Sequence, residues 1–482
     1  MSTNGDMPST RSYKDAIRAL NSLQSNFATV AVRRSAAVDA AKLMPEMLEW
    51  TARCGYTPEQ LDSLNVVHVT GTKGKGSTCA FTHSILERYR SAISGPITRM
   101  GMYTSPHLKS VRERIMLDGQ PLDEARFTRY FFEIWDKLGL AEDGGEERPA
   151  YFRFLTLLSF HVFKSEGVDT AIYEVGVGGQ YDSTNVFVRP TVTGITALGI
   201  DHTTMLGTTL AEIAWNKAGI FKKGTPAVTV VQPEEGMKVI RERAAEREVA
   251  SLEVVEKREG LAGIKLGLAG EFQKQNAAVA VELARLHLKA LGVAGMDFGL
   301  QDPIPLEFER GLEAANWPGR CQTIHEDTIT WFIDGAHTLE SVHVASEWFG
   351  SVVPKQRGQR VLLFNQQTRD VAALIRELYE TVAAAGVKFD HVIFTTNLTW
   401  SSGTYSDDLV SINTSQEQVD ELVVQKRLAE LWSQMDDKKS RKHIFHDIET
   451  SVNFIRSLEG PVDVFVCGSL HLVGGFLTVL DK

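Results

Sequence analysis

A glycine- and lysine-rich turn between an apolar strand and a helix constrains the fold of this chain more than any other feature. The turn reads VTGTKGKGST over residues 69–78, between a strand predicted over residues 64–69 and a helix predicted over residues 77–89. Glycines let successive backbone N–H groups face an anion, and a helix N-terminus adds positive potential. The sequence therefore predicts a phosphate-binding loop, in which Lys75 supplies a full charge and Ser77 a hydroxyl.

The spacing of this loop differs from the pattern G-x-x-x-x-G-K-[ST] at two positions. Val69 stands where the first glycine would be, and Gly76 separates Lys75 from Ser77. An ordinary glycine turn is the alternative interpretation. The second lysine of the loop, Lys73, and the strand–turn–helix context favour nucleotide binding.

Apolar runs of strand length alternate with helical periodicities through most of the chain, which predicts an α/β fold with largely parallel sheets. A Pro-Gly turn at residues 318–319 separates two such series. We therefore expect two α/β domains, over residues 1–316 and 317–482. Further strands are predicted at residues 170–175, 191–197, 227–231, 330–333, 361–364, 391–395 and 462–467. Helices are predicted at residues 273–291, 371–385 and 416–432, and surface loops at residues 141–148 and 399–415.

Composition excludes several classes of protein. The 482 residues include 51 Lys and Arg against 61 Asp and Glu, a net charge of −10, which gives no electrostatic footprint for nucleic acid. The four cysteines show no CxxC spacing, which favours a reducing compartment. The polar residues 1–11 lack the apolar core of a secretory signal, so we expect a cytoplasmic protein, with a mitochondrial pool if an alternative start is used. The apolar residues 460–480 fit a buried strand and helix rather than an integral membrane segment.

Two further clusters of polar side chains follow predicted strands of the first series. Glu174 begins the segment EVGVGG, and Asp201 and His202 follow the next strand. Ligands bind at the carboxyl ends of parallel strands, so Glu174 is a candidate magnesium ligand. A helix cap or an ion pair is the alternative for Glu174, and a structural role is the alternative for His202.

Other candidates lie near the predicted domain boundary and on a helix end. Lys217 stands in the segment WNKAGI, where a solvated, snorkelling lysine is the alternative. Arg320 follows the Pro-Gly turn, and Asp334 and His337 follow the first strand of the second series. Ligand sites favour domain interfaces, although an ordinary interdomain salt bridge would also explain these residues.

Taken together, these segments resemble the folylpolyglutamate synthase family, which is related to the Mur peptide ligases. The resemblance implies a P-loop-type ATPase domain followed by a smaller Rossmann-like domain. It rests on an ordered set of motifs at residues 12–16, 71–78, 103–108, 112–115, 173–185, 199–207, 217–221, 271–277, 318–320, 334–338 and 468–475.

The resemblance also implies roles for single residues. It places Mg²⁺ on Ser105, Glu174 and His202, and it matches Lys217 with a lysine that is carbamylated in the family. His337 matches a histidine near the glutamate site, so the implied catalytic residues are Lys75, Lys217 and His337. The implied ATP contacts are Gly74, Lys75, Gly76, Ser77, Asn276, Arg320 and Asp334.

The implied activity is ATP-dependent addition of L-glutamate to the γ-carboxylate of tetrahydrofolate and its polyglutamates, through an acyl phosphate. A monovalent cation such as K⁺ is a further implied cofactor, and a monomer is expected. The rival interpretations are a kinase or GTP-hydrolysing switch, a Mur-type cell-wall ligase and an ATP-gated binding module. Because each glutamate adds negative charge to the product of an acidic chain, local cations should receive it. The candidates are Lys73, Arg112, Arg114, Lys222 and Lys223.

Overall fold

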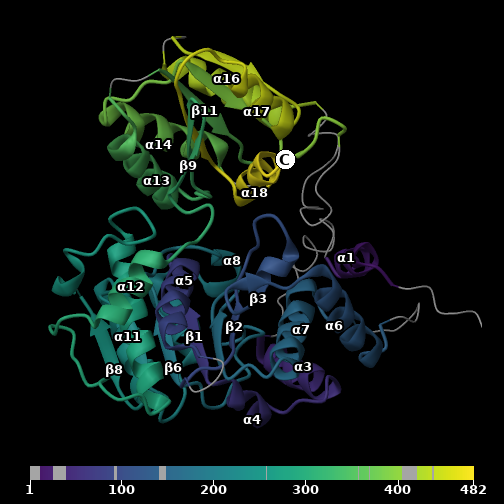
Figure 1. Ribbon diagram of the computed structural model, residues 1–482, viewed down its shortest axis with the longest axis vertical. Helices are drawn as coiled ribbons and strands as arrows, with labels where there is room; N and C mark the ends of the chain where they lie inside the picture. Colours follow the sequence, from purple (N-terminus) through teal and green to yellow (C-terminus); the bar gives the residue numbers. More distant parts are fainter. Residues whose placement is uncertain are drawn as a thin grey trace, which may run out of the picture.

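Two sheets organise the molecule (Figure 1). The computed structural model describes residues 11–24, 40–91, 95–140, 148–256, 258–355, 358–367, 370–403, 421–436 and 439–482. The strands of the first sheet lie within residues 66–255 and those of the second within residues 322–467. We call the parts of the chain built on them the first and the second domain. The predicted α/β class is confirmed. The predicted domain boundary at residue 317 falls between the two sheets and stays a prediction.

The first sheet has eight strands in the order β4-β3-β2-β5-β1-β6-β7-β8. All neighbours from β2 to β8 are parallel, and β3 is antiparallel to both β2 and β4. The parallel strands β1, β2, β5, β6 and β7 are buried on both faces, whereas the edge strand β8 is only partly buried. The strands are β1 (Val66–Thr70), β2 (Met100–Tyr103), β3 (Ile115–Leu117), β4 (Gln120–Pro121), β5 (Thr170–Glu174), β6 (Val192–Ile195), β7 (Ala227–Val230) and β8 (Leu252–Val255).

Helices cover both faces of the first sheet. One face carries α1 (Tyr13–Asn21), α3 (Ala40–Arg53), α6 (Glu124–Lys137) and α7 (Tyr151–Ser165). The other carries α5 (Lys75–Leu86), α11 (Gln273–Ala290) and α12 (Leu306–Ala314), while α9 (Leu210–Lys217) and α10 (Glu234–Glu246) pack near β6 and β7. The shorter elements are α4 (Pro58–Leu61), α8 (Thr203–Leu206), η1 (Asp62–Leu64), η2 (Glu87–Tyr89), η3 (Val111–Arg114), η4 (Ala218–Ile220) and η5 (Glu259–Leu261).

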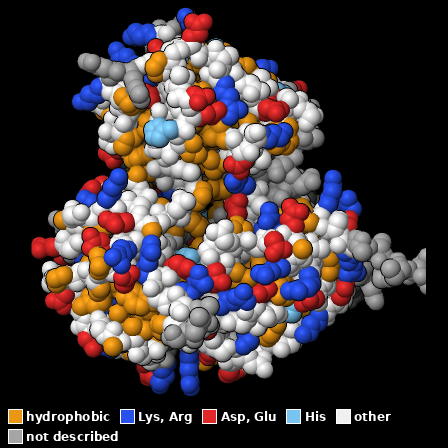
Figure 2. Space-filling model, viewed as in Figure 1, with side chains coloured by type: hydrophobic (Ala, Val, Ile, Leu, Met, Phe, Trp, Pro, Cys, Tyr) orange, Lys and Arg blue, Asp and Glu red, His pale blue; other side chains and the backbone are white. Residues whose placement is uncertain are grey.

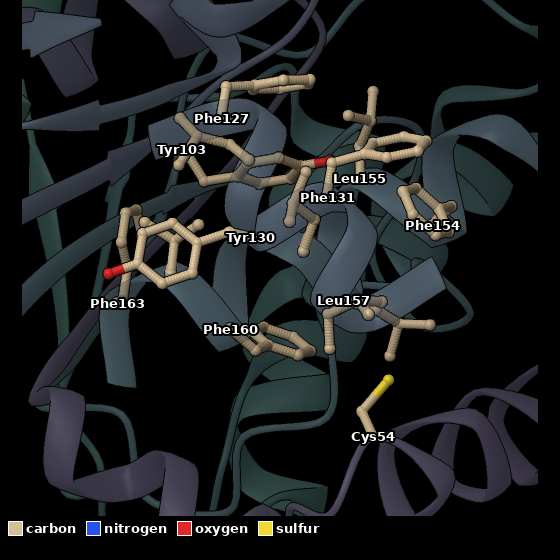
Figure 3. Close-up of a cluster of buried hydrophobic side chains, with 14 of the residues drawn as sticks. Cys54, Tyr103, Phe127, Tyr130, Phe131, Phe154, Leu155, Leu157, Phe160 and Phe163 are labelled. Carbon is tan, nitrogen blue, oxygen red and sulfur yellow. The ribbon is translucent and has the colours of Figure 1, made fainter. Parts of the chain in front are cut away.

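An aromatic cluster fills the space between α6, α7 and the sheet (Figure 3). Phe131 lies at its centre, 5.3 Å from the ring of Trp135 and 5.0 Å from that of Phe154. Tyr103 and Tyr173 project from β2 and β5 into the same cluster, with ring centroids 5.6 Å apart. Large buried rings fix the positions of the helices against the strands, so the carboxyl ends of β2 and β5 are held on a rigid base.

The second sheet has six strands in the order β13-β12-β11-β14-β10-β9, and only β9 is antiparallel to its neighbour. Helices α13, α14 and α16 cover one face, and α17 and α18 cover the other. The strands are β9 (Gln322–Glu326), β10 (Ile329–Ile333), β11 (Gln359–Phe364), β12 (His391–Phe394), β13 (Arg441–Ile444) and β14 (Val462–Cys467). The helices are α13 (Leu339–Val352), α14 (Val371–Ala384), α16 (Val423–Met435), α17 (Ile448–Arg456) and α18 (Leu470–Leu480).

The predicted elements are present with small shifts of their ends. The first strand is displaced by one to two residues, and the helix predicted over residues 77–89 begins at Lys75 because Gly74 caps it in the left-handed conformation. Residues 460–480 form β14 and α18, as expected. Most of the predicted loops, at residues 141–147 and 404–415, and the start of the helix predicted from residue 416 lie outside the described residues. Within the described ranges, no helix is long and apolar enough to cross a membrane.

Candidate active site

The phosphate loop connects β1 to α5. Gly74 has φ +85°, in the left-handed region, and is the N-cap of α5, so the backbone turns directly from the loop into the helix. A Cβ atom at Gly74 would lie 2.1 Å from Oδ1 of Asn276. Glycine is therefore required here both for the backbone conformation and for the close approach of α11. Lys75 then occupies the first turn of α5, where free backbone N–H groups accumulate.

Backbone and hydroxyl contacts hold the loop to the ends of neighbouring strands. The N–H groups of Thr72 and Lys73 donate to the carbonyl of Ala197 over 2.9 and 3.1 Å, and Oγ1 of Thr196 donates to the carbonyl of Lys73 over 2.6 Å. Oγ1 of Thr70 donates to the carbonyl of Gly178 over 2.5 Å. These bonds join the loop to the segments after β5 and β6, so it is positioned before any ligand arrives.

The first turn of α11 supports the loop from the other side. Nε2 of Gln273 donates to Oγ of Ser77 over 3.2 Å, and Nδ2 of Asn276 donates to Oε1 of Gln273 over 2.8 Å. All three side chains are buried. Asn276 therefore lies beside Gly74 and Ser77, as its predicted role as a nucleotide contact requires.

Glu174, at the carboxyl end of β5, is a buried carboxylate. Its Oε2 accepts a hydrogen bond from the backbone N–H of Ser105 over 3.0 Å, which joins two of the three predicted metal ligands. Burial raises the pKa of Glu174, while the charge of Lys75, the Ser105 N–H and the charges of Arg320 and Arg114 oppose the shift. A carboxylate that makes no ion pair with any described residue, but feels the charge of these cations, favours a bound cation or a shared proton.

Lys217 occupies a different position from the solvated one that we weighed as its alternative. The residue is 3% exposed, and Nζ donates to the carbonyl of Gly71 over 2.7 Å. Burial first, and the charge of Lys75 second, lower the pKa of its amine well below the usual range. Lys217 therefore lies behind the phosphate loop, and snorkelling is wrong for it.

The second domain contributes three predicted residues. Asp334 follows β10, is buried, and accepts a hydrogen bond from the N–H of Cys321 over 2.8 Å. Burial raises the pKa of Asp334, and the Arg320 guanidinium gives the largest opposing effect. His337 has Nδ1 2.9 Å from the carbonyl of Gly335. Since a carbonyl only accepts, Nδ1 carries a proton, and in the neutral form of the ring Nε2 is then the acceptor nitrogen.

A cavity of about 790 Å³ brings these groups together between the two domains. Figure 2 shows the waist between the domains, where hydrophobic side chains are visible. Every predicted site residue except Lys217 lines this cavity. They are Gly74, Lys75, Gly76, Ser77, Ser105, Glu174, His202, Asn276, Arg320, Asp334 and His337. The last three residues, for which an interdomain salt bridge was the alternative, therefore share one cavity wall with the phosphate loop.

His202 belongs to the exposed rim of the cavity. It is the N-cap residue of α8, with φ +50° in the left-handed region. Within the described ranges no group of three or more His, Cys, Asp and Glu side chains is arranged to hold a metal. A protein-only metal cage is therefore absent from this part of the chain. A cation bound through one carboxylate and the oxygens of a phosphate ligand needs no such cage.

Several residues of the cavity wall were not predicted as site residues. They are Phe152, Arg153, Asp182, Phe272 and Glu340. The segment after Glu174 could have indicated Asp182, whose carboxylate accepts from the Val177 and Thr184 N–H groups over 3.0 and 2.9 Å. Phe152 and Arg153 lie on α7, where helical periodicity alone gave no sign of a site.

The candidate cations for product charge divide between the cavity and the surface. Lys73 and Arg114 line the cavity. Nη1 of Arg112 donates instead to the carbonyl of Leu122, and Lys223 pairs with Glu248. Nζ of Lys222 donates to the carbonyl of Asn185, and burial lowers the pKa of Lys222 to about 8. Two of the five candidates therefore lie where an anionic ligand would contact them.

A second cavity of about 590 Å³ adjoins the first. Pro106, Arg320 and Leu470 line both cavities. The wall of the second includes His107, Leu108 and Trp317, from the loop after β2 and from the connection between the domains. Arg320 therefore stands at the boundary between two ligand-sized spaces.

The fold and the site define a two-domain α/β enzyme of the nucleotide-binding ligase class, with its phosphate loop at the domain interface. Comparison with known proteins identifies the family. The chain is 51% identical to the folylpolyglutamate synthase of Candida albicans, covering 98% of this chain and 96% of that protein. It is 48% identical to the folylpolyglutamate synthase of Saccharomyces cerevisiae strain S288c, covering 98% and 87%. The chain belongs to the folylpolyglutamate synthase family.

Two further comparisons agree with the fold. Residues 319–479 match the family model described as "Dihydrofolate synthetase, C-terminal domain". The structure of E. coli FolC in complex with DHPP and ADP superposes with a TM-score of 0.69 at 23% identity, covering 98% of each chain. The apo form of L. casei FPGS superposes with a TM-score of 0.67 at 21% identity, covering 98% of this chain and all of that one. These solved structures share the two-domain fold.

Proposed function

We propose that this protein adds L-glutamate to the γ-carboxylate of tetrahydrofolate and its polyglutamates at the expense of ATP, and so retains folates for one-carbon metabolism. One observation carries the proposal. A single cavity is lined by a phosphate loop and a buried carboxylate from the first domain and by Arg320, Asp334 and His337 from the second. A ligase must bind a nucleotide and two further substrates together, and an interface cavity allows this.

The first chemical step activates the folate carboxylate. An oxygen of the γ-carboxylate attacks the γ-phosphorus of ATP, the bond from that phosphorus to the bridging oxygen of ADP breaks, and an acyl phosphate and ADP result. Lys75 and the N–H groups at the start of α5 stabilise the charge on the transferring group. The anchored loop supplies this stabilisation without rearranging.

The second step forms the amide. The free amine of glutamate attacks the acyl carbon, the new carbon–nitrogen bond forms, and inorganic phosphate leaves from the tetrahedral intermediate with the electrons of the carbon–oxygen bond. The amine must lose a proton, and in the neutral form of the His337 ring Nε2 is an acceptor. The Nδ1 contact to the Gly335 carbonyl holds the ring in this tautomer. We assign His337 to positioning the amine or accepting its proton.

Magnesium is the cofactor that the donor set fits. Glu174 offers a buried carboxylate, and Ser105 and His202 offer a hydroxyl and an imidazole to the same cavity. Mg²⁺ is commonly held by one or two carboxylates together with substrate phosphates. When bound, the ion would neutralise charge on the phosphates. K⁺ stays a prediction that no feature of the described residues tests.

Lys217 is proposed to be carbamylated. A lysine reacts with carbon dioxide only as the free amine, and burial favours this form of Lys217 by lowering its pKa. The new nitrogen–carbon bond forms with loss of a proton and turns a cation behind the loop into an anion. Labelled bicarbonate followed by mass spectrometry tests this, and an unmodified Lys217 at saturating bicarbonate would contradict it.

The acceptor is proposed to lie at the boundary of the two cavities. Arg320 lines both of them, and Arg114 adds positive charge to the larger one. A polyanionic glutamyl tail therefore meets cations although the whole chain is acidic. We further propose that the protein acts as a monomer in the cytoplasm, since both domains that enclose the site come from one chain.

The test is ATP-dependent incorporation of labelled glutamate, with tetrahydrofolate and dihydropteroate compared as acceptors and ADP release followed in parallel. We expect product from tetrahydrofolate with matched ADP. Product from dihydropteroate would add or substitute dihydrofolate synthase activity, which the family model of the second domain makes a specific alternative. ADP release without an amide would support the kinase or switch interpretation and overturn the proposal.

A further inference from the structure

The phosphate loop holds two lysines, and their ammonium groups have different partners. Lys75 begins α5 and acts on the pKa values of Glu174 and Lys217. Lys73, two residues earlier, donates from Nζ to Oγ1 of Thr338 in the second domain over 2.9 Å. The same Nζ lies 3.6 Å from Oδ2 of Asp201. Lys73 thus bridges the two domains, although its sequence position suggests a ligand of phosphate.

The base of this bridge is fixed. The backbone of Lys73 is bonded on both sides, to Ala197 and to Thr196. Oγ1 of Thr72 donates to the carbonyl of Gly199 over 3.1 Å, which ties the loop to the segment that carries Asp201. The side chain of Asp201 is 10% exposed and that of Lys73 31%, so the carboxylate is shielded from water and the ammonium group only partly so. A charged hydrogen bond in such surroundings is stronger than one at the surface.

The other end of the bridge begins a helix. Thr338 is the N-cap of α13, and its side chain and that of Ser341 exchange capping contacts. His337 precedes it directly, and Asp334 lies four residues earlier. Glu340, in the first turn of α13, approaches the Gly199 segment, since a Cβ at Gly199 would lie 3.8 Å from its Oε2. The turn that carries Asp334 and His337 therefore packs against the phosphate loop and the Gly199 segment.

We propose that Lys73 is a positioning residue that holds the turn over residues 334–338 against the phosphate loop. It acts through Thr338, and its task is to set the place of His337 and Asp334 in the shared cavity. The positioning role rests on the proposed function, because that function makes the cavity an active site. The hydrogen bond between Lys73 and Thr338 does not depend on which amide is made. A second phosphate ligand at Lys73 is the competing role, and the two roles predict different results.

The kinetic test is a double-mutant cycle with Lys73→Met and Thr338→Val. If the two groups act through one hydrogen bond, each single substitution lowers kcat/KM for glutamate about tenfold. The double variant then has a kcat/KM within about threefold of that of the less active single variant. The affinity for ADP changes less than about threefold in Lys73→Met. Thr338→Ser keeps both the hydroxyl contact and the cap, so it serves as the matched control and should stay near wild type. Thermal melting of every variant checks that it is folded.

A role of Lys73 in binding phosphate would give a different pattern of losses. If Lys73 is a phosphate ligand, Lys73→Met loses about tenfold or more in ADP affinity, Thr338→Val keeps it, and the losses of the two variants multiply to about a hundredfold. Multiplying losses alone would also exclude the bridge, because independent sites are additive in free energy.

A structural readout separates this proposal from the proposed function. The four native cysteines are buried, so spin labels can be placed on single cysteines introduced at exposed Lys238 of α10 and Glu380 of α14. We expect Lys73→Met to broaden the distribution of distances between the two labels, and Thr338→Ser to leave it unchanged. An unchanged distribution in Lys73→Met would refute the bridge. If the wild type makes no amide at all, the proposed function fails while the label distances still decide the role of Lys73.

Discussion

Glu174 illustrates the conflict between stability and function at the level of a single residue. Its carboxylate is buried, and among the described residues its side chain accepts one hydrogen bond, from the Ser105 N–H. Burial raises its pKa, so in the folded protein the proton is held more tightly than in the unfolded chain. Between the usual value of 4.5 and the raised one, the folded state binds more protons, and the free energy of unfolding falls as the pH rises. The buried, ionised Glu174 therefore lowers the free energy of unfolding at neutral pH, and a bound cation would raise it again.

We predict that Glu174→Gln stabilises the ligand-free protein and abolishes its activity. The amide removes the buried charge, so we expect a gain of about 1 kcal/mol at neutral pH, which disappears below the usual pKa of a glutamate. Denaturant unfolding between about pH 4 and 8 measures the gain, and glutamate incorporation measures the loss. A variant that is less stable than wild type at neutral pH would contradict this reading of Glu174.

Asp182 provides the matched control. Burial also raises the pKa of its carboxyl, but its oxygens accept bonds from two backbone N–H groups and from Oγ1 of Thr184, the last over 2.6 Å. In Asp182→Asn an amide NH₂ faces donors in place of an acceptor oxygen. We therefore expect this change to destabilise the protein by about 1–3 kcal/mol, the opposite sign from Glu174→Gln.

The sequence indicated which residues carry chemistry better than it indicated how they are held. Glu174, Asp334 and Lys75 follow strands or begin a helix, and these positions made them candidates for ligand contacts, while the resemblance to the family supplied their roles. The burial of Lys217 was not predictable, because its contact with the Gly71 carbonyl joins residues 146 positions apart. Local periodicity contains no information about such a contact.

At the level of elements, the start of α5 depends on Gly74. Its φ of +85° is costly for any residue with a side chain, and the space beside it is taken by Asn276. Strain and collision therefore act together at the position where the loop becomes a helix.

We predict that Gly74→Ala weakens nucleotide binding at least about tenfold, because the loop or the start of α11 must shift to relieve a 2.1 Å contact. Gly386→Ala is the matched control, since Gly386 has φ +74° with no atom within 4 Å of a Cβ. It should cost only the backbone strain, about 1 kcal/mol of stability, and leave ADP affinity unchanged. Equal losses of ADP affinity in the two variants would mean that strain, and not the approach of Asn276, makes glycine necessary.

The elements that the sequence predicted best are most of the central parallel strands of both domains, because strands buried on both faces give continuous apolar runs. Strands β2, β3, β4, β8, β9 and β13 were not predicted, and four of them, β4, β8, β9 and β13, are the edge strands of the two sheets. They are short or half exposed, and β9 alternates between intermediate and exposed positions. Edge strands have one neighbour only, so their composition is less constrained than that of central strands.

At the level of the whole molecule, the sequence predicted two domains but not the surface on which they meet. The bridge from Lys73 to Thr338 spans 265 positions, and the cavity walls combine segments from both ends of the chain. Leu108, from the loop after β2, packs against the core beneath α17 and α18, and a Cβ on Gly474 of α18 would lie 1.9 Å from its carbonyl. Such complementarity depends on the tertiary structures of both domains, which local sequence patterns do not predict.

Arg320 joins the two domains electrostatically. It follows the connection between them, lines both cavities, and its charge opposes the raised pKa of Glu174 in one domain and of Asp334 in the other. Removing the guanidinium would raise both carboxyl pKa values further and leave the two carboxylates facing the cavity without their shared cation. Bound substrates would then be enclosed less well, and the acyl phosphate would meet water.

We therefore predict that Arg320→Ala lowers glutamate incorporation at least about a hundredfold at saturating ATP, and that the acidic limb of its pH profile moves to higher pH. The direction of this shift follows from the loss of a cation, since carboxylates with higher pKa values need a higher pH to ionise. Arg320→Lys keeps the charge but not the planar fork, so it should restore the position of the acidic limb while recovering only part of the rate. Incorporation and ADP release measured together show whether the acyl phosphate is lost to water. Wild-type incorporation by Arg320→Ala, or an acidic limb that Arg320→Lys does not restore, would show that this arginine does not act on the two carboxylates.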